Sequence, residues 1–291
     1  MKKKNLLSKL HVNGTYYIIA ALLLLAGIPL YQLLVLIPAG YNGALEATRT
    51  GHVAVYLAWI GSHSIPFIIY RSLLVIAFVL LISFPFTLFR IIVAQEIMSE
   101  QENAAAQGDQ TELANDELAA TTEENQGEQE ENTDANDMSA HVWRGKGFLI
   151  IAAWSGLFGV IAYILGTVAS TLYLLFTSRG FTADTATASK FAPLSTTLSF
   201  IANSIGVGLL ALAMLFFGAV IARRGLNLWP GIWLALGYVA LAVAALLSGS
   251  AVAAVAAPPA SQATLSTPAT LLFALWIVWF GTMLVRLKPE L

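Results

Sequence analysis

Six long runs of apolar residues, separated by short polar segments, dominate the chain. One helical crossing of a hydrocarbon core about 30 Å thick needs roughly 17 to 25 mainly apolar residues. Each of the six runs reaches that length. We therefore predict an all-α integral membrane protein, a bundle of six transmembrane helices at 16–38, 65–90, 147–176, 196–222, 229–256 and 269–285.

A seventh apolar run, 53–60, is too short to cross a membrane. It contains Tyr56 and Trp59, and such amphipathic aromatic side chains suit the headgroup level of a bilayer. We predict an outer interfacial or re-entrant segment over 50–64, between the first two spans.

The first fourteen residues mix four lysines with leucine and valine, a pattern that predicts an amphipathic segment at the membrane surface. A cleaved signal peptide is the alternative. The apolar run that follows, 16–38, is too long for a signal peptide and has no small-residue cleavage site near its end. We therefore expect 1–14 to be a cytoplasmic N-terminal segment and 15–96 to hold the first two spans.

An acidic segment, 97–140, separates the second span from the third. It holds thirteen of the seventeen Asp and Glu residues and contains no Lys, Arg or aromatic residue. Such a composition buries too little apolar surface to offset the entropy lost on folding. We predict a disordered, low-complexity loop that acts as a charged tether or recruits a basic partner. Residues 141–291 then hold spans three to six and a short tail.

Basic residues set the predicted orientation. With the N terminus inside, eleven Lys and Arg residues fall on the cytoplasmic side and three fall outside. Cytoplasmic loops of membrane proteins carry an excess of Lys and Arg, whereas Asp and Glu contribute little to orientation. We therefore predict a cell (plasma or inner) membrane protein with both termini and the acidic loop in the cytoplasm.

Arg71 is the one charged residue in the interior of a predicted span, since Arg90 stands at the cytoplasmic end of the second span. A charge in hydrocarbon costs several kcal/mol, so intramembrane ionisable residues commonly have a function. Arg71 lies about two turns inside the outer edge of the second span, where its long side chain can also extend to the headgroups. Both interpretations stay open: a headgroup contact, or an inward cavity in which Arg71 holds an anionic group.

Uncharged polar residues gather in the outer halves of the predicted spans. Thr196, Ser199, Asn203 and Gly206 have the spacing of one helix face. We take this as a candidate polar cavity open to the outside. The alternative is hydrogen bonding between helices, which membrane bundles use routinely. The candidate lining residues are Arg71, Asn203, Gln32, Ser199 and Ser170.

The chain lacks the usual sequence signals of catalysis. It has no Cys, no phosphate-binding loop, no H-E-x-x-H and no G-x-S-x-G. Its four histidines are not spaced as ligands of one ion, and no basic, aromatic nucleic-acid surface is evident. We expect no catalytic residues, no metal site, no cofactor and no nucleic-acid partner.

Two functions stay open, and we expect neither to be enzymatic. The first is a membrane-embedded binding or transport component that accepts a small or lipid-like solute from outside, as permease subunits that use a separate ATPase do. The second is an accessory or scaffolding subunit of a membrane protein complex. An enzyme acting within the membrane ranks third. The expected partners are the lipid bilayer, other membrane proteins and, for a permease, that ATPase.

Overall fold

The computed structural model describes residues 2–49, 52–98, 134–179, 194, 197–225, 229–256 and 259–287. Every regular element in this part of the chain is helical, and it contains no strand. Six segments are long and apolar enough to cross a membrane: Ser8–Leu36, Ser64–Met98, Gly147–Arg179, Thr197–Arg223, Gly231–Ala256 and Ser266–Val285. The prediction of an all-helical protein with six candidate spans is therefore confirmed.

The first candidate span contains two π-helical segments. It comprises α1 (Lys2–Leu22), the π-helical η1 (Leu23–Gly27), α2 (Ile28–Tyr31) and the π-helical η2 (Gln32–Leu36). Pro29 lies between the two π-helical segments and has no amide hydrogen to donate to the preceding turn. Single π-helical turns within membrane helices often mark functional sites.

The second candidate span is broken near its middle. Helix α5 (Ser64–Leu80) ends in a tight turn at 81–83, and a further helix covers 84–98. In this turn the Leu81 amide donates to the Phe78 carbonyl oxygen over 3.1 Å. The sequence predicts a kink at Pro85, and the break lies just before that residue, which the missing amide hydrogen of proline explains.

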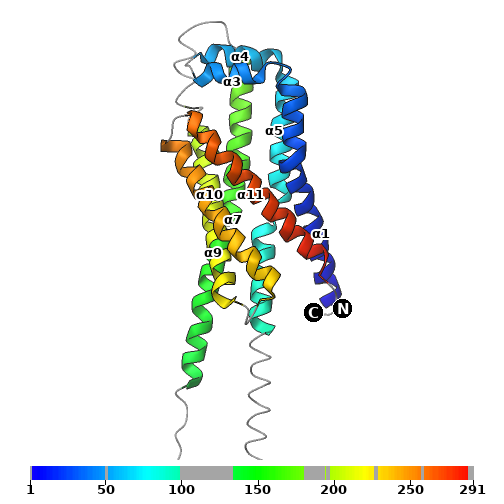
Figure 1. Cartoon of the computed structure of the whole chain (residues 1–291), viewed down its shortest axis with the longest axis vertical. Helices are drawn as coiled ribbons and strands as arrows, with labels where there is room; N and C mark the ends of the chain where they lie inside the picture. The colour runs from blue at the N-terminus through cyan, green and yellow to red at the C-terminus, as the bar shows by residue number, and fades with distance from the viewer. Residues whose placement is uncertain are drawn as a thin grey trace, which may run out of the picture.

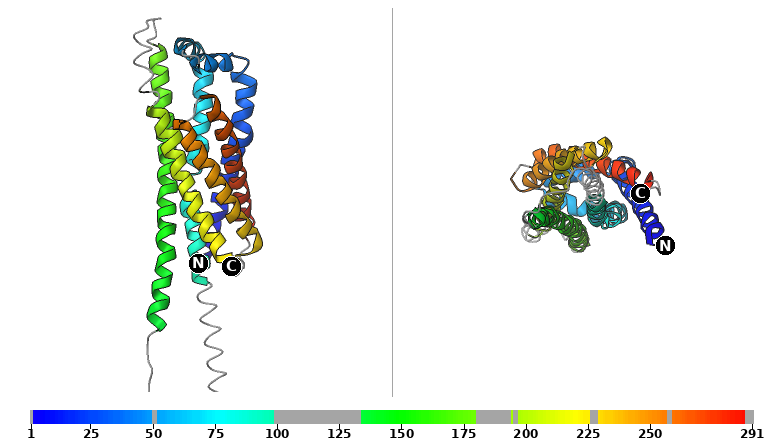
Figure 2. Two further views of the ribbon diagram at one scale, coloured as in Figure 1. Left: turned by 60° about the vertical axis from the view of Figure 1, so that its left-hand side comes forward. Right: turned by 90° about the horizontal axis from the view of Figure 1, so that it is seen from below.

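The six candidate spans form a closed ring. Helix α7 (Asp134–Arg179) packs against α5 on one side and against η3 (Ile201–Gly206) and α9 (Val207–Arg224) on the other. Helix α10 (Gly231–Ala256) follows α9 and packs against α11 (Pro259–Val285), and α11 packs against α1. Because α1 also contacts α5, the first and last spans close the ring (Figure 2).

Two short helices, α3 (Tyr41–Arg49) and α4 (Val53–Ser62), lie across one end of the ring (Figure 1). We call them the α3–α4 cap. The Trp59 indole nitrogen donates to the Ala39 carbonyl oxygen over 2.6 Å, and the Tyr41 and Trp59 ring centroids are 5.1 Å apart. As predicted, the short apolar run does not cross the bundle. Both termini lie at the opposite end (Figure 1).

The N-terminal residues continue directly into the first span as one helix. The Asn13 amide donates to the Thr87 hydroxyl over 3.0 Å, and His11 Nε2 lies 2.9 Å from the Leu287 carbonyl oxygen. A Cβ on Gly14 would lie only 2.9 Å from the Gly281 carbonyl oxygen. Residues 11–14 therefore pack on neighbouring helices, and the position of 1–14 relative to a membrane surface stays a prediction.

Most of the predicted acidic loop lies outside the described residues. The helix of the second span ends at Met98, and α7 begins at Asp134. Residues 97–98 and 134–140 of the predicted loop are therefore helical. The helix propensities of these residues permit this conformation. Helix α7 extends well beyond the end of the ring (Figure 2).

Facing glycines bring neighbouring helices close together. A Cβ on Gly159 of α7 would lie 2.9 Å from the Gly206 carbonyl oxygen, and one on Gly218 of α9 would lie 2.8 Å from the Gly237 carbonyl oxygen. Small residues at membrane helix contacts let backbones approach closely, since lipid supplies little hydrophobic drive for association. These contacts fix the third, fourth and fifth spans around the centre of the ring.

Candidate functional site

A central cavity of about 210 Å³ lies inside the ring. All six candidate spans contribute to its wall. One lining residue from each span, in chain order, is Leu24, Leu74, Tyr163, Asn203, Ser250 and Thr270. A cavity with this composition is a feature of the whole ring, because removing any one helix would open its wall.

The polar lining residues occupy the end of the central cavity nearer the α3–α4 cap. Asn203 lies early in the fourth span, Ser250 lies late in the fifth, and Ser266 and Thr270 lie early in the sixth. These four residues reach the same end because successive spans run in opposite directions. Leu210 and Leu247 line the cavity farther from the cap. The cavity thus has an uncharged polar half and an apolar half.

Irregular backbone borders the central cavity on two sides. Leu24 belongs to η1 and Asn203 belongs to η3, both π-helical. The Asn203 amide donates to the Ser199 hydroxyl over 3.0 Å, and the Ser204 hydroxyl donates to the Ala251 carbonyl oxygen of α10 over 3.1 Å. An amide side chain can form four hydrogen bonds, so Asn203 keeps both donor and acceptor capacity for a ligand.

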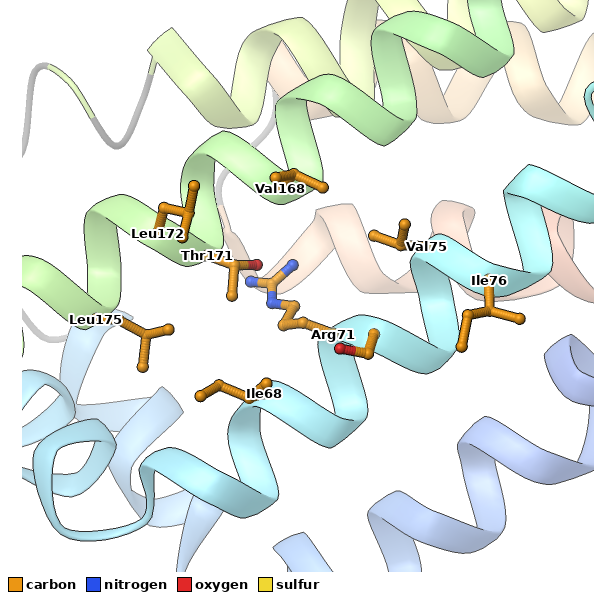
Figure 3. Close-up of a pocket in the computed structure, with 9 residues that line it drawn as sticks. Ile68, Arg71, Val75, Ile76, Val168, Thr171, Leu172 and Leu175 are labelled. Carbon is orange, nitrogen blue, oxygen red and sulfur yellow. The ribbon is translucent and has the colours of Figure 1, made fainter.

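A second cavity is a groove of about 500 Å³ between α5 and α7. Its walls are mostly apolar, and Arg71 projects between the two helices toward Thr171 (Figure 3). The apolar wall residues are Ile68, Val75 and Ile76 of α5 with Val168, Leu172 and Leu175 of α7. Ser72 also lines the groove, which is hereafter the α5–α7 groove.

Aromatic residues surround the inner side of Arg71. Its guanidinium carbon lies 5.3 Å from the Phe67 ring centroid, a cation–π geometry. Arg71 also interacts electrostatically with the phenols of Tyr56, Tyr41 and Tyr70. Its Nε atom is buried without a hydrogen-bond partner among the described residues. The guanidinium is thus fixed from the cap side while the side chain still lines the groove.

The cap tyrosines do not neutralise Arg71. Burial raises the pKa of the Tyr41 and Tyr56 phenols, and the nearby Arg71 charge, which acts in the opposite direction, is outweighed. Both phenols are therefore uncharged at neutral pH. No Asp or Glu in the described part of the chain contributes to the electrostatic environment of Arg71. Its positive charge is stabilised there by dipoles and rings alone.

Tyr163 of α7 lies between the two cavities. It lines the central cavity, and its ring stacks on Phe78 with centroids 3.9 Å apart. Its phenol also interacts electrostatically with Arg71, which lines the α5–α7 groove. Tyr163 and Phe78 thus line the central cavity but not the groove, and Tyr163 is the cavity residue that interacts with Arg71 of the groove.

The five residues predicted as cavity lining fall in different places. Arg71 lines the α5–α7 groove, Asn203 lines the central cavity, and Ser199 accepts the Asn203 hydrogen bond. Ser170 donates to the Thr167 carbonyl oxygen of its own helix over 3.0 Å. Gln32, in η2, is partly exposed and, like Ser170, lines neither cavity.

Sequence reasoning overlooked Tyr163, and it placed Tyr56 at the headgroup level without linking Tyr56 or Tyr41 to Arg71. Tyr163 sits in an apolar run where nothing along the chain distinguishes it from packing residues. Ser250 carries a signal, since it belongs to the polar residues in the outer halves of the spans. Among the described residues, no group of three or more His, Asp or Glu side chains is placed to hold a metal ion.

Comparison of the chain with protein-family models, with curated proteins and with solved structures finds no match.

Proposed function

We propose that this chain is a non-enzymatic, multi-pass membrane protein that binds a solute in its central cavity and acts as a permease-like transport component. The observation that carries this proposal is the single cavity to which all six spans contribute. A site at the centre of a helix ring can be reached from either end when the helices move relative to one another, which is how transporters work.

The chemistry of the lining supports binding rather than catalysis. The polar lining residues named above are an amide, hydroxyls and a phenol, which are suited to hydrogen bonding. The π-helical turns at the cavity are a second support, because irregular backbone at membrane depth is tolerated where it lines a cavity. Transporter sites are commonly built from interrupted helices of this kind.

The proposed orientation follows from the eleven-to-three distribution of basic residues. It places the α3–α4 cap and the polar half of the cavity on the outside of the cell membrane. Both termini and the acidic segment 97–140 then face the cytoplasm. Since the chain has no ATP-binding loop of its own, an ATP-driven version of this function needs a separate ATPase as partner.

The second candidate function is that of an accessory or scaffolding subunit. It is favoured by α7, which extends beyond the ring next to the acidic segment (Figure 2). A helix that projects from a bundle offers a surface for another protein. This function needs no solute in the central cavity and no access to it from the cytoplasm.

Cysteine accessibility distinguishes the two functions, because the natural chain contains no Cys and therefore no background reaction. Ser250→Cys faces the central cavity, whereas Val252→Cys, on the same helix, replaces a side chain that is 65% exposed on the outer surface of the ring. A membrane-impermeant methanethiosulfonate added to intact cells should modify Ser250→Cys, because thiols ionise only in water, and should leave Val252→Cys unmodified.

Transport additionally requires access from the other side. In inside-out vesicles, the same reagent should modify Leu247→Cys, which lines the cavity farther from the cap. An accessory subunit predicts modification from outside only. The proposal fails if Ser250→Cys is unreactive in intact cells, or if Val252→Cys reacts equally fast.

A further inference from the structure

We infer that the α5–α7 groove is a binding site for an anionic membrane lipid, with Arg71 holding the charged head and the apolar walls holding an acyl chain. This site is separate from the central cavity and does not depend on what the central cavity binds. The inference rests on four observations: an uncompensated charge, its depth, the side from which the groove opens, and the donors it presents.

The charge is the first observation. A guanidinium placed within a membrane helix is costly and persists when it is paired or used. In the described part of the chain, its partners are the Tyr56 hydroxyl and aromatic rings, and its Nε has no partner. An anion in the groove would supply the missing counter-charge through charge-assisted hydrogen bonds, which are stronger than neutral ones.

The depth of Arg71 suits a lipid head. Arg71 lies seven residues after Ser64, the first residue of α5, which corresponds to about 10 Å along the helix axis. The long arginine side chain can meet a headgroup at this depth without pulling it into the hydrocarbon. From Arg71 the groove continues along Val75 and Ile76 toward the middle of the span, which is the direction an acyl chain takes.

The groove opens sideways. Leu172 is 50% exposed and Ile76 is 48% exposed, yet both line it on helices apolar enough to cross a membrane. In a bilayer these side chains would face hydrocarbon. A ligand must therefore arrive through lipid, which favours an amphiphile over a water-soluble anion. The volume of about 500 Å³ lies within the roughly 300–1,000 Å³ typical of ligand sites.

The donors are arranged on one wall. Ser72 lines the groove beside Arg71, and its hydroxyl forms no hydrogen bond within the described residues. Thr171, on the opposite wall, already donates to the Thr167 carbonyl oxygen over 2.7 Å. Electrostatic interaction with Tyr56 and the Phe67 ring positions the guanidinium from the cap side. A headgroup would thus meet a preorganised Arg71 together with the Ser72 hydroxyl.

Native mass spectrometry of the purified full chain tests the site. The probes are phosphatidylglycerol and phosphatidylcholine with identical acyl chains, titrated in mild detergent. We expect wild type to retain phosphatidylglycerol roughly tenfold or more tightly, as expected for a charge-assisted contact. Arg71→Gln should remove this preference, whereas Arg90→Gln, which removes an exposed charge from the same span, should keep it.

A second pair of variants covers the case in which Arg71→Gln does not fold. Val168→Trp fills the groove and leaves the residues that contact Arg71 intact, and Leu165→Trp adds the same bulk at a 61% exposed position outside it. Bound phosphatidylglycerol should be lost in Val168→Trp and retained in Leu165→Trp.

The inference is overturned if wild type binds both lipids equally, or if Val168→Trp retains phosphatidylglycerol. It is also overturned if inorganic phosphate displaces the lipid, since the site would then take a free anion. None of these outcomes affects the reactivity of Ser250→Cys, so failure of the lipid site leaves the proposed function of the central cavity standing.

Discussion

The central cavity and the α5–α7 groove both involve helices α5 and α7 but differ in chemistry. Six helices surround the cavity, and its polar residues are uncharged. Two helices form the groove, and it combines the Arg71 guanidinium with apolar walls. The interior of the ring therefore offers hydrogen bonds, whereas the side of the ring offers a charge. The comparison teaches that an intramembrane charge need not mark the central site of a helix bundle.

We expect the strongest effect from truncating Tyr163, which lines the central cavity and interacts electrostatically with Arg71. Tyr163→Ala deletes a half-buried ring stacked on Phe78, and the cost of about 3–5 kcal/mol for truncating a fully buried aromatic side chain is the upper bound for this change. Tyr163→Phe should lose much less, because it keeps the stacked ring. We expect the melting temperature in detergent to fall strongly for the first variant only.

Tyr163→Ala should also join the two spaces. Ser72→Cys lines the groove and should resist an impermeant thiol reagent while the Tyr163 ring is in place. In the Tyr163→Ala background the same cysteine should become reactive. An unchanged rate would mean that Tyr163 does not separate the groove from the central cavity.

A smaller effect should follow from adding a bulky side chain where α7 packs closely against η3 and α9. A Cβ on Gly159 would lie 2.8 Å from the Leu210 amide nitrogen, so Gly159→Val forces the two backbones apart. Overpacking of this kind costs about 1–3 kcal/mol. Gly147→Val is the matched control on the same helix, since nothing lies within 4 Å of its Cβ position. Equal thermal stability of the two variants would contradict the close packing described for the ring.

The smallest effect on stability should come from the α3–α4 cap, whose tyrosines interact electrostatically with Arg71. Burial raises the pKa of the Tyr41 and Tyr56 phenols. Because the folded state disfavours ionisation, stability should be constant at lower pH and fall as the pH rises above about 10, the usual value for tyrosine. The fall in melting temperature should be reduced in Tyr41→Phe and retained in Tyr16→Phe, whose ring is 45% exposed. Identical alkaline profiles would contradict the buried cap.

The six candidate spans could be predicted because length and apolar content alone decide whether a helix can cross a bilayer. The short helix α4 could be predicted for the same reason. The ring could not, since a pattern along one helix does not say which neighbour covers which face. The facing Gly159 and Gly206, for example, are far apart in sequence and become partners only through packing.

The candidate cavity illustrates the same limit. The sequence predicts that Arg71 and Asn203 line one cavity, because both lie near the outer ends of their spans. Depth alone does not fix the direction in which a side chain points. The structure directs them into two different spaces. The predicted polar face of the fourth span also assumed regular α-helix, whereas η3 is π-helical and rotates the following residues. The sequence therefore predicts the depth at which polar residues lie in the bundle. It does not predict that they line two separate cavities.

We propose that water fills the central cavity and that lipid fills the α5–α7 groove. Labelling two single cysteines in the native membrane, Ser250→Cys in the cavity and Val168→Cys in the groove, tests this most directly. We predict that an impermeant thiol reagent added outside modifies only Ser250→Cys, whereas Val168→Cys reacts only after the protein is denatured in SDS, because a thiol surrounded by lipid does not ionise. Reaction of both cysteines with the impermeant reagent at similar rates would contradict the account.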